Sequence, residues 1–254
     1  MIVGMKHAVN LNALLKVYRA KKPLATKPSL PGRCLLCNDI TNTALCAPCA
    51  ANLPLPKGYC PRCAEPLPHK GIECGRCQQQ SPPVSDTYAA LRYEWPVDRL
   101  IQQFKFNRNL VAGRALANAM AQTMATQLQQ QKKPDYLLPM PLHHSRLRGR
   151  QFNQAGELAN QLGELLNIPV LNHHVLRKRA TRTQSLLNAR ERRRNMRGAF
   201  TTNSSVSLAG KHIAIVDDVM TTGNSVFSLA KTLKKAGVTT VDAWVAARAP
   251  NKHH

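Results

Sequence analysis

Acidic residues are scarce in this sequence. Asp and Glu number 13 against 36 Lys and Arg, which gives a formal net charge of +23 at pH 7. So large an excess of positive charge favours attraction to nucleic acids and to phosphate groups. The excess is also compatible with a role in solubility alone, and it carries no information about the fold.

Long apolar runs are absent as well. No stretch approaches the roughly 18 residues that a membrane-spanning helix needs, so we expect no membrane span. The first 20 residues carry Lys6, His7 and Lys16 among scattered apolar residues. They lack the continuous apolar core and the cleavage site of a secretion signal. The sequence therefore predicts a cytoplasmic protein with a flexible basic extension over residues 1–30.

Large apolar side chains are few between residues 31 and 80, so this segment cannot form a core by burial alone. All eight cysteines of the chain lie here in four Cys-x-x-Cys pairs. Thiolates at this spacing reach one tetrahedral Zn²⁺ from a tight turn, and in a reducing compartment the pattern favours metal over disulfides. The predicted zinc ligands are Cys34, Cys37, Cys46, Cys49, Cys60, Cys63, Cys74 and Cys77.

The spacing leaves the pairing of the four motifs open. Sequential pairing gives one site from the first two motifs and a second from the last two, and interleaved pairing is compatible with the same spacing. Four thiolates also suit an iron–sulfur cluster, and a disulfide framework would need an exported chain. His69 is a spare candidate ligand, which we interpret as a solvated loop residue. We expect one or two structural zinc sites in a module over residues 31–80.

The stretch from His212 to Ser225 combines an apolar run, an acidic pair and a hydroxyl-bearing turn. Residues 213–216 predict a buried strand of a parallel sheet, and a helix capped by Gly237 is expected to begin near Ser225. Ligands of open α/β sheets lie beyond the carboxyl ends of the strands, and helix N-termini favour phosphate. We therefore expect Asp217 and Asp218 to bind two ribose hydroxyls, and the turn to bind a 5-phosphate. The turn residues are Thr221, Thr222, Gly223, Asn224 and Ser225.

An ordinary strand with a polar exit loop is the alternative for this stretch, since Asp, Thr, Gly and Asn are common turn residues. The rest of residues 86–250, after a short boundary at 81–85, alternates strand and helix patterns. This alternation predicts an α/β domain with a parallel sheet flanked by helices. The expected strands are 87–93, 136–142 and 238–247, and the expected helices are 96–106, 110–131 and 153–166. We interpret Phe104-Lys105-Phe106 as a helix end rather than as a base-stacking site.

Two arginine-rich segments accompany this pattern. Arg146, Arg148 and Arg150 follow the strand predicted at 136–142, where guanidinium groups suit pyrophosphate oxygens; a solvated basic loop is the alternative. Residues 175–200 carry the densest charge, and such runs are usually mobile or bind polyanions. We predict there a long loop with a short helix that covers the site. The candidate nucleic-acid contacts are Arg190, Arg192, Arg193, Arg194 and Arg197.

Several of these segments resemble known sequences. The stretch 212–225 resembles the phosphoribosyl-pyrophosphate (PRPP) signature of type I phosphoribosyltransferases. With the cysteine pairs, it makes residues 31–248 similar to the ComF/GntX family, in which a double zinc ribbon precedes a phosphoribosyltransferase-like domain. Two positions depart from the family pattern: Gly149 is displaced relative to Phe152-Asn153, and Asn224-Ser225 replaces the commoner Ser/Ala-Thr. The other matching segments are Leu138–Leu142, Arg146–Gln154 and Thr183–Phe200.

The resemblance implies a PRPP–Mg²⁺ site, with Asp217 and Asp218 as the catalytic pair if the domain is an active transferase. It also implies a part in the uptake or use of external DNA, as in natural transformation, with contact to single-stranded DNA. One alternative is an active phosphoribosyltransferase that acts on an unidentified nucleobase-like acceptor. Another is a non-catalytic zinc-ribbon module that docks a DNA-processing partner such as a helicase. The sequence shows no residue set that specifies a base, so it leaves catalysis open.

Overall fold

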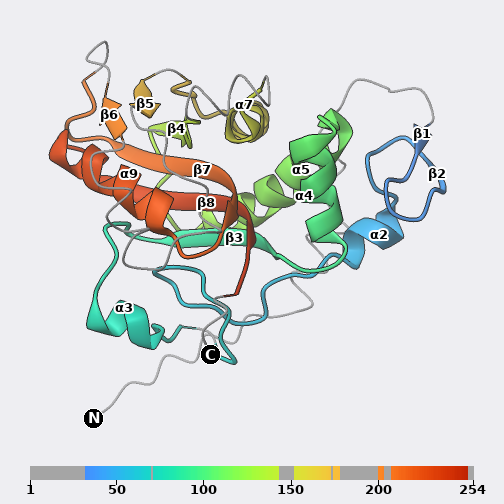
Figure 1. Cartoon of the computed structure of the whole chain (residues 1–254), viewed down its shortest axis with the longest axis horizontal. Helices are drawn as coiled ribbons and strands as arrows, with labels where there is room; N and C mark the ends of the chain where they lie inside the picture. The colour runs from blue at the N-terminus through green and yellow to red at the C-terminus, as the bar shows by residue number, and fades with distance from the viewer. Residues whose placement is uncertain are drawn as a thin grey trace.

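The computed structural model describes residues 32–69, 71–142, 152–172, 174–177, 200–202 and 207–250. The predicted extension 1–30 lies outside this part of the chain. The two arginine sets predicted as pyrophosphate and nucleic-acid contacts also lie outside it, within 143–151 and 178–199. The described residues form a parallel sheet between layers of helices, with a cysteine-rich segment beside it (Figure 1).

The sheet has four parallel strands in the order β3-β8-β7-β4. Leu138 and Ala243 lie opposite Ile215 of the central strand β7. The strands are nearly continuous apolar runs because helices cover both faces of the sheet. The four strands are β3 (Thr87–Arg92), β4 (Tyr136–Pro139), β7 (His212–Met220) and β8 (Thr240–Arg248).

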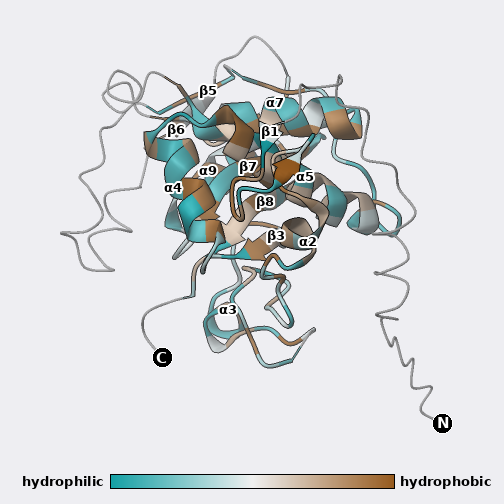
Figure 2. Cartoon of the chain, turned by 90° about the vertical axis from the view of Figure 1, so that its right-hand side faces the viewer, coloured by the Kyte–Doolittle hydropathy of each residue, from teal (hydrophilic) through white to brown (hydrophobic). Residues whose placement is uncertain are grey.

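Helices divide between the two faces of the sheet. Ala214 and Val216 of β7 pack in the apolar cluster of the three helices on one face, whereas Ile213 and Ile215 pack with α9 on the other. In Figure 2 the helices carry apolar (brown) and polar (teal) residues side by side, as expected of helices with one buried face. The helices are α4 (Val97–Phe106), α5 (Leu110–Gln127) and α7 (Gln154–Leu166) on one face, and α9 (Asn224–Lys235) on the other.

The cysteine-rich segment contains little regular structure. It includes the two-residue strands β1 (Gly32–Arg33) and β2 (Ile40–Thr41), which pair antiparallel, and the short helices α2 (Ala47–Ala51) and α3 (Gly75–Gln79). Cys34 packs in the cluster of α4 and α5, whereas Cys60 and Cys63 pack in the cluster of α9. The two halves of the segment therefore join different apolar layers of the molecule.

The structure differs from several of the sequence predictions. The strand predicted at 136–142 ends at Pro139, and the helix predicted at 110–131 ends at Gln127. Strand β7 continues to Met220, so Asp217 and Asp218 lie within the strand rather than closing it. Val175–Arg177 forms a strand, β5, where we expected the start of a loop. Its antiparallel partner β6 (Phe200–Thr202) is distant in sequence, so the local pattern carried no sign of this pairing. Among the described residues, no helix is long and apolar enough to cross a membrane.

Candidate functional site

Asp218 meets a lysine at the carboxyl edge of the sheet. The Nζ atom of Lys105, at the end of α4, lies 3.0 Å from Oδ2 of Asp218. The Asp218 side chain is 10% exposed and that of Lys105 is 22% exposed. In this largely buried setting, an ion pair of this geometry compensates a carboxylate charge that would otherwise be costly to bury.

Packing around the end of α4 places Lys105. The neighbouring Phe104 is fully buried, and its ring meets that of Phe152 edge-on at 5.7 Å. The Gln154 side-chain amide donates to the Lys105 carbonyl at 3.4 Å, which ties the end of α4 to the start of α7. The sequence interpretation of this segment as a plain helix end missed the lysine, because its partner lies more than 100 residues away.

Asp217 has an unusual protonation behaviour for an aspartate. Removal from water and the neighbouring charge of Asp218 raise its pKa to about 7, against an ordinary value of 3.8, although Lys105 partly opposes this rise. The two carboxylates also accept backbone hydrogen bonds: Oδ1 of Asp217 from the Asp218 amide at 2.9 Å, and Oδ1 of Asp218 from the Val219 amide at 2.6 Å. The pair is therefore held in place before any ligand arrives.

The turn after β7 depends on Gly223. Its φ of +77° lies in the left-handed region, and an added Cβ would come within 2.6 Å of the Met220 side chain and 2.7 Å of the Phe227 ring. Gly223 is also the residue before α9, and its carbonyl accepts the Phe227 amide at 2.8 Å. The N–H groups of residues 224–226 therefore have no acceptor within the helix. A phosphate is the ligand that such a helix start favours.

Met140 and Asn153, which precede and follow the segment with Arg146, Arg148 and Arg150 in sequence, lie at this same edge. The Met140 amide donates to the Val216 carbonyl at 2.8 Å, and the Asn153 side chain donates to the Met140 carbonyl at 3.3 Å. The arginines themselves, and the set Arg190, Arg192, Arg193, Arg194 and Arg197, lie outside the described residues.

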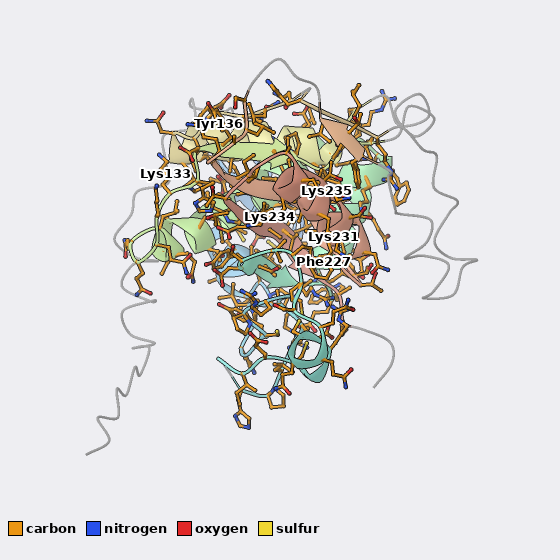
Figure 3. All side chains as sticks on the ribbon, turned by 90° about the vertical axis from the view of Figure 1, so that its left-hand side faces the viewer. Lys133, Tyr136, Phe227, Lys231, Lys234 and Lys235 are labelled. Atoms are coloured by element: carbon orange, nitrogen blue, oxygen red, sulfur yellow. The ribbon has the colours of Figure 1, made fainter. Side chains whose placement is uncertain are left out.

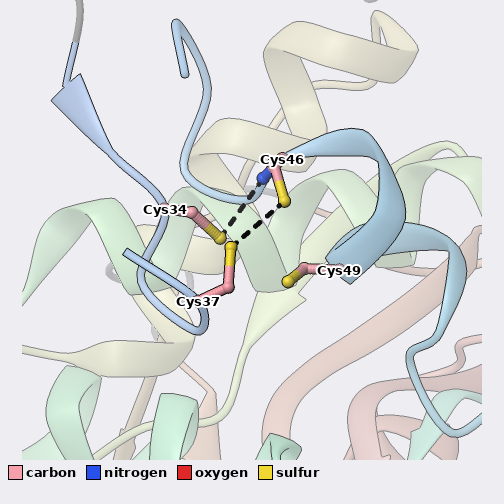
Figure 4. A group of neighbouring side chains, drawn as sticks. All are labelled: Cys34, Cys37, Cys46 and Cys49. Atoms are coloured by element: carbon pink, nitrogen blue, oxygen red, sulfur yellow. Dashed lines mark hydrogen bonds between the residues drawn. The ribbon is translucent and has the colours of Figure 1, made fainter. Parts of the chain in front are cut away.

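The eight cysteines form two groups by sequential pairing. In each group the four sulfur atoms lie within 4.8 Å of one another. Cys37 Sγ is 3.5 Å from Cys46 Sγ in the first group (Figure 4), and Cys63 Sγ is 3.6 Å from Cys74 Sγ in the second. The first cysteine group is Cys34, Cys37, Cys46 and Cys49, and the second is Cys60, Cys63, Cys74 and Cys77.

These distances fit a tetrahedral zinc site. Four thiolates around Zn²⁺ at about 2.3 Å lie about 3.8 Å apart. Backbone amides already favour one thiolate: although burial acts against ionisation, hydrogen bonds from the backbone of Cys37, Cys46 and Leu36 lower the pKa of Cys34 to about 6. Burial raises the pKa of Cys63 to about 11. An all-cysteine donor set leaves no open position, as expected of a structural rather than a catalytic metal.

Comparison with known proteins agrees with both parts of this arrangement. Residues 27–78 match the double zinc ribbon domain, and residues 110–253 match the phosphoribosyl transferase domain. Competence protein F of Haemophilus influenzae is 36% identical over 85% of this chain and 97% of its own length. The chain belongs to the ComF/GntX family. DNA utilization protein YhgH of Escherichia coli K12 is 34% identical over 87% of this chain and 98% of its own length.

Solved structures of phosphoribosyltransferases are more distant from this ComF/GntX family member. A glutamine PRPP amidotransferase from B. subtilis complexed with ADP and GMP matches 58% of this chain and 30% of its own, with 17% identity and a TM-score of 0.38. A purine phosphoribosyltransferase from Pyrococcus horikoshii matches 50% of this chain with a TM-score of 0.30. Likenesses of this size carry no functional inference.

Proposed function

We propose that the carboxyl edge of the sheet binds PRPP, or a related ribose 5-phosphate, together with Mg²⁺. The observation that supports this proposal is that the acidic pair in β7 is followed closely by the start of α9. Gly223, in the left-handed conformation, joins the two. Asp217 and Asp218 accept hydrogen bonds from two neighbouring ribose hydroxyls. The N–H groups of residues 222–225 bind the 5-phosphate at the positive end of the helix dipole.

Positive charge near the acidic pair suits a polyphosphate ligand. Lys105 already lies 3.0 Å from Asp218, and Met140 and Asn153, which precede and follow the segment with Arg146, Arg148 and Arg150 in sequence, are hydrogen-bonded to each other at the same edge. Mg²⁺ in such sites is held largely by phosphate oxygens, ribose hydroxyls and water, so few protein ligands are needed. The acidic pair and a PRPP-bound Mg²⁺ therefore belong to one site.

Isothermal titration of PRPP–Mg²⁺ tests the proposal. We expect Asp217→Asn and Asp218→Asn each to weaken binding about tenfold or more, because each removes a charged acceptor of a hydroxyl. Asp98→Asn, on the first turn of α4, is the matched control and should bind as the wild type does. Equal affinities in all four proteins would contradict the proposal. Release of pyrophosphate in the presence of nucleobases, lost in Asp218→Asn, would identify an active transferase instead of a binding protein.

The DNA-related part of the proposal places the protein in the uptake or use of external DNA, with contact to single-stranded DNA. The names of its relatives, Competence protein F and DNA utilization protein YhgH, support this role. In the described part of the chain, α9 offers a basic face: Lys231, Lys234 and Lys235 are exposed, and the helix contains no acidic residue. Figure 3 shows these lysines with Phe227, Lys133 and Tyr136 on one side of the molecule.

Salt-dependent binding of a single-stranded oligonucleotide tests this contact. Each lost phosphate contact should reduce the slope of log affinity against log salt by about 0.7, so the triple variant K231A/K234A/K235A should lose about two units. The control K57A/R99A/R114A removes the same charge from exposed positions elsewhere. If both triples lower the affinity equally, net charge rather than α9 accounts for binding. The sequence-predicted contacts, Arg190 to Arg197, call for the same comparison.

A further inference from the structure

An arginine of the cysteine-rich segment holds the turn that follows β7. Arg76 lies on α3, between Cys74 and Cys77 of the second cysteine group. Its Nη1 atom donates to the carbonyl oxygen of Thr222 at 3.0 Å. The cysteine turn fixes the backbone of Arg76, since the amides of Cys77 and Gln78 both donate to the Cys74 carbonyl, at 2.8 and 3.1 Å.

The contact controls the direction of an amide in the turn. The Thr222 carbonyl and the Gly223 N–H belong to one planar peptide unit, and in a trans peptide they point in opposite directions. A hydrogen bond that holds the carbonyl toward Arg76 therefore holds the Gly223 N–H on the other side. Gly223 is the residue whose free rotation would otherwise be largest, because it has no side chain.

A second arginine holds the other end of the same turn. Arg248, at the end of β8, is 1% exposed and donates to the Met220 carbonyl at 3.2 Å. It also donates from Nε to the Cys63 carbonyl at 3.0 Å and forms a buried ion pair with Glu65. Met220 and Thr222 are thus both tied to the second cysteine group, each through one arginine.

The first cysteine group makes different contacts. Arg33, beside Cys34, donates from Nη1 to the Asn38 carbonyl at 3.1 Å, within its own part of the segment. Cys34 packs with α4 and α5, whereas Cys60 and Cys63 share an apolar cluster with Met220 and Val226 at either end of the turn. The two groups therefore differ in their relation to the candidate ribose-phosphate site.

We infer that Arg76 is a positioning residue of the 221–225 turn, and that the second cysteine group, with its zinc, shapes the ribose-phosphate site while the first does not. This inference rests on the proposed binding of a ribose 5-phosphate at that turn. The zinc ribbons of this protein are then not equivalent: one stabilises the helical layer, and the other sets the geometry of phosphate-binding amides.

Arg76→Ala, with Arg33→Ala as the matched control, tests the positioning role. In the absence of ligand, hydrogen exchange of the amides from Thr222 to Ser225 should quicken in Arg76→Ala only, with the urea midpoint unchanged. The affinity for ribose 5-phosphate should fall about tenfold in the same variant, whereas Arg33→Ala should bind as the wild type does. Because exchange is measured without ligand, a mere loss of attractive charge does not produce the first result. Equal exchange in the two variants would overturn the inference.

Cys74→Ser and Cys46→Ser test the role of the metal. Both cysteines are half-exposed and precede a five-residue helix, and serine is a good helix N-cap, so the replacements are matched. Each variant should lose one zinc in a colorimetric assay, but only Cys74→Ser should show faster exchange of the turn and weaker binding. Equal loss of affinity in both variants would overturn the inference. If Cys74→Ser does not fold, the Arg76 comparison decides.

The proposed function and this inference fail in different ways. If the wild-type protein does not bind ribose 5-phosphate, the proposed function is wrong, and the ligand-free exchange data still show whether Arg76 positions the turn. If binding is normal and exchange is insensitive to Arg76, the site stands and the positioning role is wrong.

Discussion

The Lys105 amine lies 3.0 Å from the Asp218 carboxylate at the carboxyl edge of the sheet, and the two residues come from the end of α4 and the end of β7. The contact joins two elements that are remote in sequence but adjacent in the fold. It also gives Asp218 a cation partner in an ion pair, so removal of Lys105 has a defined electrostatic consequence.

Lys105→Gln should destabilise the protein by about 1–3 kcal/mol, because it leaves the buried Asp218 carboxylate without its charged partner. Urea unfolding of Lys105→Gln, Asp218→Asn and the double variant measures the coupling. We expect the double variant to lose less than the sum of the single losses. Additive losses within about 0.5 kcal/mol would show that the ion pair contributes little.

Asp217 should make stability depend on pH. Its pKa is raised to about 7 in the folded protein against 3.8 ordinarily, so the folded state binds the proton more tightly than the unfolded state. Its contribution to stability is therefore complete below about pH 4 and is lost as the pH rises through about 7. The side chain of Asp217→Asn cannot ionise. The Tm of this variant minus that of the wild type should therefore increase as the pH is raised from about 5 to about 8.

The control for this pH dependence is Lys105→Gln, because the lysine lowers the pKa of Asp217. In that background the pKa of Asp217 should be higher still, so the same rise in relative Tm on replacing Asp217 should extend to higher pH and be larger. Thermal unfolding with excess zinc measures both series. A Tm difference that stays constant over this pH range would contradict the raised pKa.

Gly223→Ala should cost more stability than Gly210→Ala. Both glycines have positive φ, +77° and +74°, so each replacement meets the backbone penalty of about 1–2 kcal/mol. The added methyl at position 223 also meets Met220 and Phe227, whereas at position 210 nothing lies within 4 Å. Overpacking adds about 1–3 kcal/mol. Equal losses in urea unfolding would show that the turn accommodates the methyl.

Breaking the buried ion pair between Glu65 and Arg248 should reduce the stability of the protein more than breaking an exposed ion pair. The two side chains are 4% and 1% exposed. Glu65→Ala should destabilise by about 3–5 kcal/mol, because it leaves a buried guanidinium unpaired. Glu94→Ala removes an ion pair at 2.8 Å to Arg92 whose side chains are both 42% exposed, and it should cost at most about 1 kcal/mol. Similar losses of stability in the two variants would contradict the prediction that the buried ion pair contributes more than the exposed one.

Local patterns in the sequence predicted much of this molecule. The apolar run 213–216 became the central strand, the pattern after Ser225 became α9, and the Cys-x-x-Cys spacing led to two groups of sulfur atoms. These features depend on residues close in sequence, or on strong chemical preferences. The spacing left the pairing of the motifs open, and the structure shows it to be sequential.

Contacts between distant segments could not be predicted in this way. Lys105 looked like the end of a helix, because nothing nearby in sequence identifies its partner Asp218. The same applies to Arg76 and Thr222, which are 146 positions apart, and to Glu65 and Arg248, which are 183 apart. Such contacts arise only after the sheet and its helices have packed. Side-chain periodicity reports which face of an element is buried, but not which element covers it.

The pairing of Glu65 with Arg248 has a consequence for synthesis of the chain. The ribosome makes the second cysteine group early. The Cys63 carbonyl and the Glu65 carboxylate gain their partner, Arg248, only when the last strand, β8, has been made. Cys60 and Cys63 pack in a cluster that includes Val241, Ala243 and Val245 of β8, so their burial is incomplete until that strand has been made. A chain that ends before β8 therefore lacks the Arg248 contact to the Met220 carbonyl, at the start of the turn that follows β7.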